Sequence, residues 1–209
     1  MDLEIRYKVH QNYLKMSSYH RIQTEAWLRT IDVNCERLLD VGGSQLPIKG
    51  RTKSWSVKDY RILDLKQPHE CKQKPDIVWD INKEANYAIY SPKEEFDIIF
   101  CIEVSEYWWN PVKALENINK MLKQNGILWI TFPFVYGYHK PEGTDFLRYT
   151  PTGAEKLLQE TGFKILEHKF RITNNSKLEE FYIEERMKFL PIYNKVIGIM
   201  LKAQKYEFK

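Results

Sequence analysis

The stretch that most constrains the fold is a short apolar run followed by an acid and two glycines, at residues 37–44. Leu38, Leu39 and Val41 are too few for a helix, so they predict a short buried strand. A glycine pair directly after a strand allows positive φ values and lets a ligand approach the main chain. We expect a helix to follow, because strand, glycine turn and helix place a nucleotide-like ligand at the carboxyl end of a parallel sheet.

Short apolar runs recur along the chain, and three of them carry an acid at or near their end: Asp40, Asp64 and Asp80. Asp64 lies 24 positions beyond Asp40 (64 − 40). An acid about 20 residues past a glycine turn, at the end of the next strand, typically accepts hydrogen bonds from ribose hydroxyls. The expected strands cover residues 37–41, 60–64, 76–81, 96–102, 127–132, 163–172 and 196–203.

Two helices are expected to begin at a polar residue followed by proline, which supplies an N-cap and a pre-set first turn. One follows Asn110-Pro111 and ends at Asn125-Gly126; the other follows Thr150-Pro151 and ends at Gly162. The apolar face of the first is formed by Val112, Leu115, Ile118 and Leu122. Strands that alternate with helices predict one α/β domain with a mostly parallel sheet.

The two ends of the chain are read as additions to this core. We expect a single domain over 1–209, with a helical leader or lid at 1–34, a core at 35–172, and a helix (177–190) and last strand at 173–209. Ser17 or Ser18 is expected to cap a leader helix. Its expected buried face is Tyr19, Ile22, Ala26 and Trp27. The leader is rich in aromatic rings, so it either covers a ligand or packs on the domain. The apolar stretch 196–201 is compatible with a last strand and equally with a homodimer contact. The oligomeric state stays open.

Composition limits the classes of partner and the compartment. The net charge of +4 comes from 32 basic and 28 acidic residues without a block of one sign, which argues against binding to duplex nucleic acid. The three cysteines, Cys35, Cys71 and Cys101, are widely spaced, so we expect reduced thiols rather than disulfides or a zinc site. No signal peptide or membrane span is evident, and a cytoplasmic location is expected.

Residues 37–163 resemble the Rossmann-like, class I S-adenosylmethionine-dependent methyltransferases, in particular the type 11-like group. The residues that carry the resemblance are Leu39-Asp40-Val41-Gly42-Gly43, Asp64, Asp80, the segment 96–111 with its Glu and Pro, Gly126–Pro133, His139-Lys140-Pro141, 145–151 and Thr161-Gly162-Phe163. The last three resemble a subgroup common among enzymes that methylate sugars and other small metabolites. The resemblance implies a three-layer sandwich around a seven-stranded sheet.

The resemblance also implies roles for individual residues. Gly42 and Gly43 would lie near the methionine part of S-adenosylmethionine, and Asp64 would bind the ribose hydroxyls. Asp80 would accept a hydrogen bond from the adenine amine. The Ile81 main chain would lie beside the adenine, and Cys101 and Ile102 would lie beside the methyl group. Asp40 would orient the glycine loop or reach the amino group of the cofactor indirectly. No metal is implied.

Two departures from the family pattern keep a non-catalytic binding or scaffold subunit open as an alternative. Ser44 and Leu46 stand where the turn usually has further glycines, and a Cβ makes a turn less permissive. Ser105-Glu106-Tyr107 replaces the usual Leu-Glu-His.

For the acceptor, a hydroxyl nucleophile needs its proton removed, and His139 is the candidate base. The predicted function is methyl transfer to a small molecule or glycan, at oxygen. Candidate acceptor contacts are Glu103, Glu106, Tyr107, Asp145 and Arg148, although Asp145 and Arg148 are also well placed to pair with each other. Rings at 107–109, 136 and 138 suit a sugar, an aromatic or a nucleoside acceptor.

Other reactions lack their signatures. The chain has Cys101-Ile102-Glu103-Val104 where amino-methylating enzymes of nucleic acids carry Asn/Asp-Pro-Pro-aromatic, and it lacks the Pro-Cys pair of cytosine-carbon enzymes. The clustered acids of metal-assisted catechol methylation are missing, and so is the Gly-x-Gly-x-x-Gly of nicotinamide dehydrogenases. Methylation of RNA or protein stays open as a second alternative.

Overall fold

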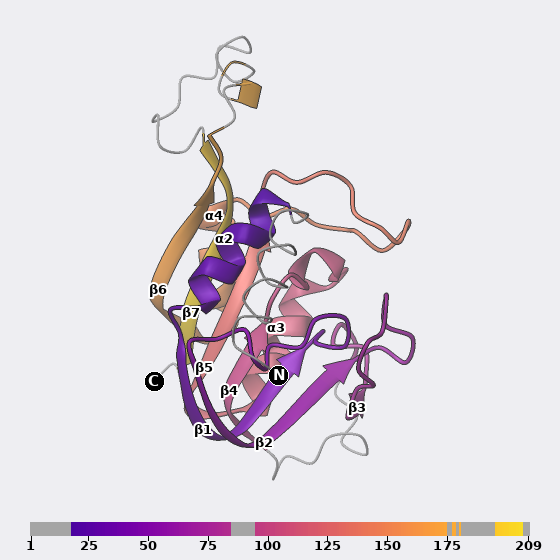
Figure 1. Ribbon diagram of the computed structural model, residues 1–209, viewed down its shortest axis with the longest axis vertical. Helices are drawn as coiled ribbons and strands as arrows, with labels where there is room; N and C mark the ends of the chain where they lie inside the picture. The colour runs from indigo at the N-terminus through magenta and orange to yellow at the C-terminus, as the bar shows by residue number, and fades with distance from the viewer. Residues whose placement is uncertain (1–17, 85–94, 175–176, 179, 181–194, 207–209) are drawn as a thin grey trace, which may run out of the picture.

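A seven-stranded sheet forms the centre of the molecule (Figure 1). The computed structural model describes residues 18–84, 95–174, 177–178, 180 and 195–206. The strand order is β3-β2-β1-β4-β5-β7-β6, in which β7 runs antiparallel to both of its neighbours and the other pairs are parallel. The strands are β1 (Asp32–Val41), β2 (Ser54–Asp64), β3 (Ile77–Val78), β4 (Phe96–Cys101), β5 (Leu122–Pro133), β6 (Phe163–Ile172) and β7 (Val196–Lys205). The predicted fold class and all seven expected strands are confirmed.

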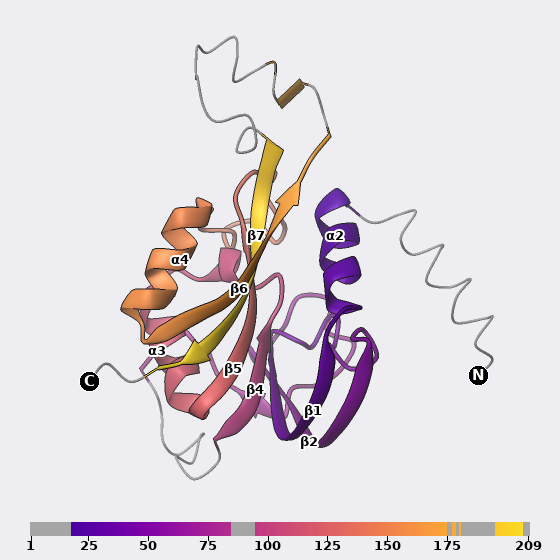
Figure 2. The ribbon, with the colours of Figure 1, turned by 90° about the vertical axis from the view of Figure 1, so that its left-hand side faces the viewer.

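Helices cover both faces of the sheet, which gives three layers (Figure 2). Helix α2 (Tyr19–Leu28) lies on one face, and α3 (Pro111–Met121) and α4 (Pro151–Glu160) lie on the other. Side chains alternate along the strands, so Leu38 and Phe100 pack towards α2 while Leu39 and Ile99 pack in the core beneath α3 and α4. The N-caps of all three helices are the predicted ones: Ser18, Asn110 and Thr150.

No helix follows the glycine turn, and this expectation was wrong. Residues 42–53 form turns and bends between β1 and β2. The Ser44 carbonyl in that loop accepts hydrogen bonds from the N–H groups of Lys72 and Gln73, both at 2.9 Å. The loop after β1 is therefore tied to the loop after β2 instead of coiling on itself.

The helix after Asn110 ends at Met121 rather than at Asn125, because Leu122 is already the first buried residue of β5. Asn125, with φ +63°, and Gly126 form a sharp bend inside the strand. A Cβ on Gly126 would lie 2.8 Å from the Lys123 carbonyl oxygen, so the glycine is needed for the bend and does not mark a helix end.

Two further expectations need correction. The buried face of α2 is Thr24, Glu25, Trp27 and Leu28, whereas Tyr19 and Ala26 are exposed. The apolar stretch 196–201 is buried in β7 between two neighbouring strands, so it is not a surface for a homodimer contact. The leader up to residue 17 and most of the expected helix at 177–190 lie outside the described residues. The domain limits stay a prediction.

Candidate cofactor and acceptor site

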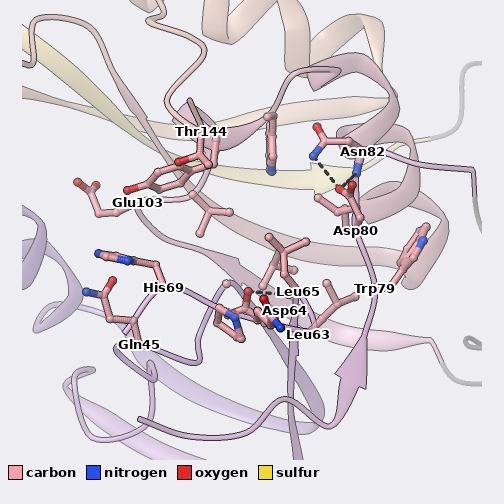
Figure 3. A pocket seen from close by; sticks show the side chains of 18 of the residues that line it. Gln45, Leu63, Asp64, Leu65, His69, Trp79, Asp80, Asn82, Glu103 and Thr144 are labelled. Atoms are coloured by element: carbon pink, nitrogen blue, oxygen red, sulfur yellow. Dashed lines mark hydrogen bonds between the residues drawn. The ribbon is translucent and has the colours of Figure 1, made fainter. Parts of the chain in front are cut away.

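A cavity of about 530 Å3 opens at the carboxyl ends of β1, β2, β3 and β4 (Figure 3). This is the edge at which open α/β sheets bind their ligands. Figure 3 shows three acids spread along it, with Asp80 at one end, Asp64 in the middle and Glu103 at the other end. Eight of the residues singled out from the sequence line the cavity: Gly42, Asp64, Asp80, Ile81, Glu103, Tyr107, Trp108 and Trp109.

The glycine turn needs both of its glycines for steric reasons. Gly42 has φ +75°, and a Cβ there would lie 2.4 Å from Val104 Cγ2. A Cβ on Gly43 would lie 2.4 Å from the carboxyl carbon of Asp40. Gly42 lines the cavity and Gly43 does not. Gly43 thus acts by giving room to the Asp40 carboxylate.

Asp40 is buried and holds the loop instead of facing the cavity. Its Oδ2 accepts hydrogen bonds from the Ile48 N–H and the Tyr60 hydroxyl, both at 2.7 Å. Burial raises the pKa of Asp40 to about 6, and these two hydrogen bonds oppose the rise. The structure therefore places Asp40 behind the turn, where it fixes the path of residues 42–48.

Asp64 is the last residue of β2 and Asp80 follows β3, and both line the cavity. Asp64 receives the Leu65 N–H on Oδ1 at 2.8 Å and the Ser44 N–H on Oδ2 at 3.1 Å, which fixes its carboxylate. Asp80 is oriented by Asn82, whose N–H and Nδ2 both donate to Asp80 Oδ1, at 3.1 and 2.9 Å. Each carboxylate keeps acceptor capacity for a ligand, because a carboxylate offers about four lone-pair sites.

Glu103 has a left-handed backbone, with φ +58°, which is uncommon for a residue with a side chain. Its N–H donates to Thr131 Oγ1 and its Oε1 accepts from the same hydroxyl, both at 2.8 Å. Arg171 Nη1 donates to Oε1 at 2.5 Å. Burial is the largest influence and would raise the pKa of Glu103, but the Arg171, Arg21 and His20 charges and the Thr131 hydrogen bond together outweigh it and lower the pKa below the ordinary value. The carboxylate is thus fixed and kept ionised.

Arg171 is a functional candidate that the sequence did not reveal. It lies near the end of β6, is fully buried and also contacts Thr24 of α2 at 3.3 Å. A Cβ on Gly198 of the neighbouring β7 would lie 2.6 Å from Arg171 Nε, so that glycine makes room for the guanidinium. An arginine in an edge strand ordinarily indicates an exposed side chain, so no sequence pattern distinguishes this one.

His139 does not line the cavity, but it contacts a residue that does. Its Nδ1 forms a hydrogen bond with the Tyr107 hydroxyl and lies 2.6 Å from the Lys140 carbonyl oxygen. The His139 N–H donates to Asp145 Oδ2 at 2.6 Å, and both oxygens of Asp145 bind Arg148, at 2.5 and 2.6 Å. The pairing of Asp145 with Arg148 is the arrangement present, and it braces the loop outside the cavity.

Three other residues singled out from the sequence do not line the cavity. Cys101 is fully buried, and burial raises the pKa of its thiol well above the ordinary value. Ile102 packs with the α2-side core. Glu106 is buried, its Oε2 has no partner among the described residues, and burial together with the Glu103 charge raises its pKa to about 7. Its main-chain oxygen accepts the Phe146 N–H at 2.8 Å.

The cavity also contains polar residues that the sequence did not single out, chiefly His69 and Gln45. Both come from loops after β1 and β2 and lie on the Glu103 side in Figure 3. Gln45 Nε2 donates to Glu70 Oε2 at 2.9 Å across these loops. The only sequence signal for His69 is its position soon after the acid that ends β2, since residues there reach the ligand edge of the sheet.

The described residues contain no group of three or more His, Cys, Asp or Glu side chains arranged to hold a metal ion. Within the same part of the chain, no helix has the length and apolar character needed to cross a membrane.

One family of known proteins matches part of the chain. The model of the methyltransferase domain family matches residues 65–130, which include the loop after β2, β3, β4 and α3. The match covers 66 of the 209 residues (130 − 65 + 1), so this segment of the chain is similar to the methyltransferase domain family. No curated protein has a significantly similar sequence.

Solved structures share the fold at low sequence identity. An S-adenosylmethionine-dependent methyltransferase from Mesorhizobium loti superposes with a TM-score of 0.57 at 12% identity, covering 90% of this chain and 99% of that one. An S-adenosylmethionine-dependent methyltransferase from Clostridium acetobutylicum superposes with a TM-score of 0.55 at 14% identity, covering 97% of this chain and 100% of that one. The [4+2]-cyclase SpnF gives 0.56 at 17% identity, covering 91% and 81%. Because that last protein is a cyclase, the shared fold does not by itself determine the reaction.

Proposed function

We propose that this protein is an S-adenosylmethionine-dependent methyltransferase that transfers a methyl group to a hydroxyl of a small molecule or glycan. The observation that carries the proposal is the placement of Gly42, Asp64 and Asp80 at three successive strand ends around one cavity. A small-molecule acceptor is favoured over duplex nucleic acid because the charges of the chain are mixed. The three cysteines in the structure are free thiols, which supports a cytoplasmic location.

The residues present fit S-adenosylmethionine. The Asp64 carboxylate can accept hydrogen bonds from two ribose hydroxyls. Asp80, which Asn82 orients, can accept a hydrogen bond from the adenine amine beside the Ile81 main chain. Gly42 offers bare main chain to the amino-acid part. We assign Asp40 and Gly43 to the shape of the turn, and assign no direct contact to the buried Cys101 and Ile102 side chains.

On the acceptor side, Tyr107 lines the cavity, and its hydroxyl is hydrogen-bonded to His139 in the loop outside the cavity. Bound S-adenosylmethionine supplies an electrophilic methyl group. Burial, and next the Glu106 charge, raise the pKa of Tyr107, so its hydroxyl stays neutral at pH 7. We infer that Tyr107 receives the acceptor proton while passing its own to the unprotonated Nδ1 of His139, whose ring proton is then on Nε2. His139 is thus the base and Tyr107 the contact residue.

One observation favours a second candidate function. Residues 42–53 lack the helix expected after the glycine turn, and a helix N-terminus is a common site for the charged part of a nucleotide-like ligand. A chain that lost cofactor use would serve as a methyltransferase-like binding subunit instead. Affinity for the cofactor separates the two functions.

The test is calorimetric titration of the purified protein with S-adenosylmethionine and S-adenosylhomocysteine. Loss of a charged hydrogen-bond partner costs about 1.5–3 kcal/mol, so Asp64→Ala should weaken binding by about 10- to 100-fold. The matched control is Asp59→Ala, which removes a carboxylate from the same strand outside the cavity. A folded wild type that binds neither ligand at millimolar concentration rules out the enzyme and leaves the binding subunit.

A further inference from the structure

The wall of the cavity is strongly biased in charge. Its residues include four carboxylates, Asp64, Glu70, Asp80 and Glu103, and neither a lysine nor an arginine among the described residues that line it. The bias does not follow from composition, because the chain has 32 basic residues against 28 acidic ones and a net charge of +4. A ligand that enters this cavity therefore meets a negative potential.

Two arginines near the cavity are paired with acids of their own. Arg171 is opposed by Glu103, and Arg148 by both oxygens of Asp145. Behind Glu103, the buried Glu106 adds a further carboxyl group whose Oε2 has no partner within the described residues. Lys83 is 3.7 Å from Asp80, at the end of the cavity away from Glu103.

Glu103 itself has one oxygen left for a ligand. In the described part of the chain, the hydrogen bonds from Thr131 and Arg171 both reach Oε1. Its side chain is 17% exposed, and the residue lines the cavity. A fixed carboxylate with a free oxygen is a strong acceptor for a charged donor, because charge-assisted hydrogen bonds are about twice as strong as neutral ones.

Aromatic side chains form much of the remaining wall on the acceptor side. Tyr107, Trp108 and Trp109 follow β4, and Phe146 comes from the loop after β5. Trp109 and Phe146 are about half exposed. Ring faces attract cations, most strongly when water is excluded, and they do not attract phosphates or carboxylates.

We propose that the acceptor carries a protonated amine besides the hydroxyl that receives the methyl group, and that this amine binds at the Glu103 end of the cavity. The inference rests on the proposed function, and it narrows the acceptor to amine-bearing alcohols and phenols such as amino sugars or hydroxylated arylalkyl amines. Acceptors with a phosphate or carboxylate are rejected, because they would bring a further negative charge against a wall with four carboxylates and, among the described residues that line it, no lysine or arginine.

The experiment compares matched ligands on protein loaded with S-adenosylhomocysteine. One series is tyramine, tyrosol and 4-hydroxyphenylacetate; the other is glucosamine, glucose and glucose 6-phosphate. Each series keeps its frame and changes the charge from positive to neutral to negative. In at least one series the amine should bind about tenfold more tightly than the neutral compound, and the anion should not bind at about 10 mM. Equal affinities, tighter binding of an anion, or no binding in either series overturns the proposal.

A variant pair assigns the effect to one side chain. Glu103→Gln should remove the preference for the amine, whereas Glu167→Gln, at an exposed position of β6, should leave it unchanged. If Glu103→Gln weakens S-adenosylmethionine but keeps the preference for the amine, Glu103 serves the cofactor and the proposal fails. The wild-type comparison decides the case even where the variant does not fold. Binding of S-adenosylhomocysteine to wild type separates failure of this inference from failure of the proposed function.

Discussion

At the scale of single residues, Glu106 is a buried carboxyl group whose charge the fold opposes. Burial and the nearby Glu103 raise its pKa to about 7, from an ordinary value of 4.5. The folded protein therefore binds this proton more tightly than the unfolded chain between about pH 4.5 and 7. The contribution of Glu106 to stability is complete below that window and is lost as the pH rises through it.

We expect Glu106→Gln to become progressively more stable relative to wild type as the pH rises from about 5 to 7.5, because Gln carries no charge to bury. The measurement is urea unfolding of both proteins at a series of pH values. The difference between variant and wild type isolates Glu106, since Asp40 and the other shifted groups are present in both. A difference in unfolding free energy that does not change with pH would contradict the shifted ionisation.

The cavity residues that the sequence revealed are those set by strand ends. Asp64 and Asp80 could be placed because each ends an apolar run, and parallel strands bring such ends to one edge. Arg171 could not be placed, because its burial depends on the pairing with Gly198 in β7. That pairing is set by the register of the two strands and leaves no local sequence pattern. His139 was singled out as a base, whereas the hydroxyl that lines the cavity belongs to Tyr107.

At the scale of elements, helix α2 is joined to the loop after β1 by a buried ion pair. Arg51 Nη2 and Nε reach Glu25 Oε1 at 2.6 and 3.1 Å, and the two side chains are 11% and 5% exposed. Arg51 Nη1 also donates to the Leu46 carbonyl at 2.8 Å. This pair supports a loop that has no helix of its own.

Removing one partner of a buried ion pair leaves an uncompensated charge, so Glu25→Gln should lower the free energy of unfolding by about 3 kcal/mol. Glu36→Gln is the matched control, because the Lys58–Glu36 pair is 77% and 62% exposed and should contribute about 0.5 kcal/mol or less. Both values come from denaturant unfolding monitored by tryptophan fluorescence. Equal effects of the two substitutions would mean that α2 is not held through this pair.

Element boundaries were predictable where a cap or an apolar pattern acts locally. Asn110 and Thr150 cap their helices as expected, because the signal lies within four residues. The end of α3 was missed, since Asn125-Gly126 bends a strand by the same left-handed geometry that ends many helices. The missing helix after β1 could not be foreseen, because contacts with Lys72, Gln73 and Glu25 come from distant segments.

At the scale of the whole molecule, the sheet divides into two parts with different tasks. The parallel strands β3, β2, β1 and β4 provide the loops that carry the cavity acids, and the antiparallel pair β7 and β6 closes the far edge. The described contact from that edge to the cavity is Arg171, which reaches Glu103. Ligand binding should therefore order one half of the molecule and leave most of the other unchanged.

We expect saturation with S-adenosylhomocysteine to slow amide hydrogen exchange in 42–46, 64–70, 79–82 and 103–109, the segments around the cavity. At a ligand concentration of about 100 times Kd, binding to the native state adds about 2.7 kcal/mol, so global exchange from fully unfolded molecules slows equally everywhere. The informative signal is the faster exchange through local openings, which should slow only near the cavity. In the Asp64→Ala protein, whose Kd we expect to be about 10- to 100-fold higher, the same ligand concentration is only about 1 to 10 times Kd, so binding adds about 0.4–1.4 kcal/mol and these segments should be protected less than in wild type. Protection confined to β6 and β7 would place the ligand on the other side of the molecule and would refute the site described above.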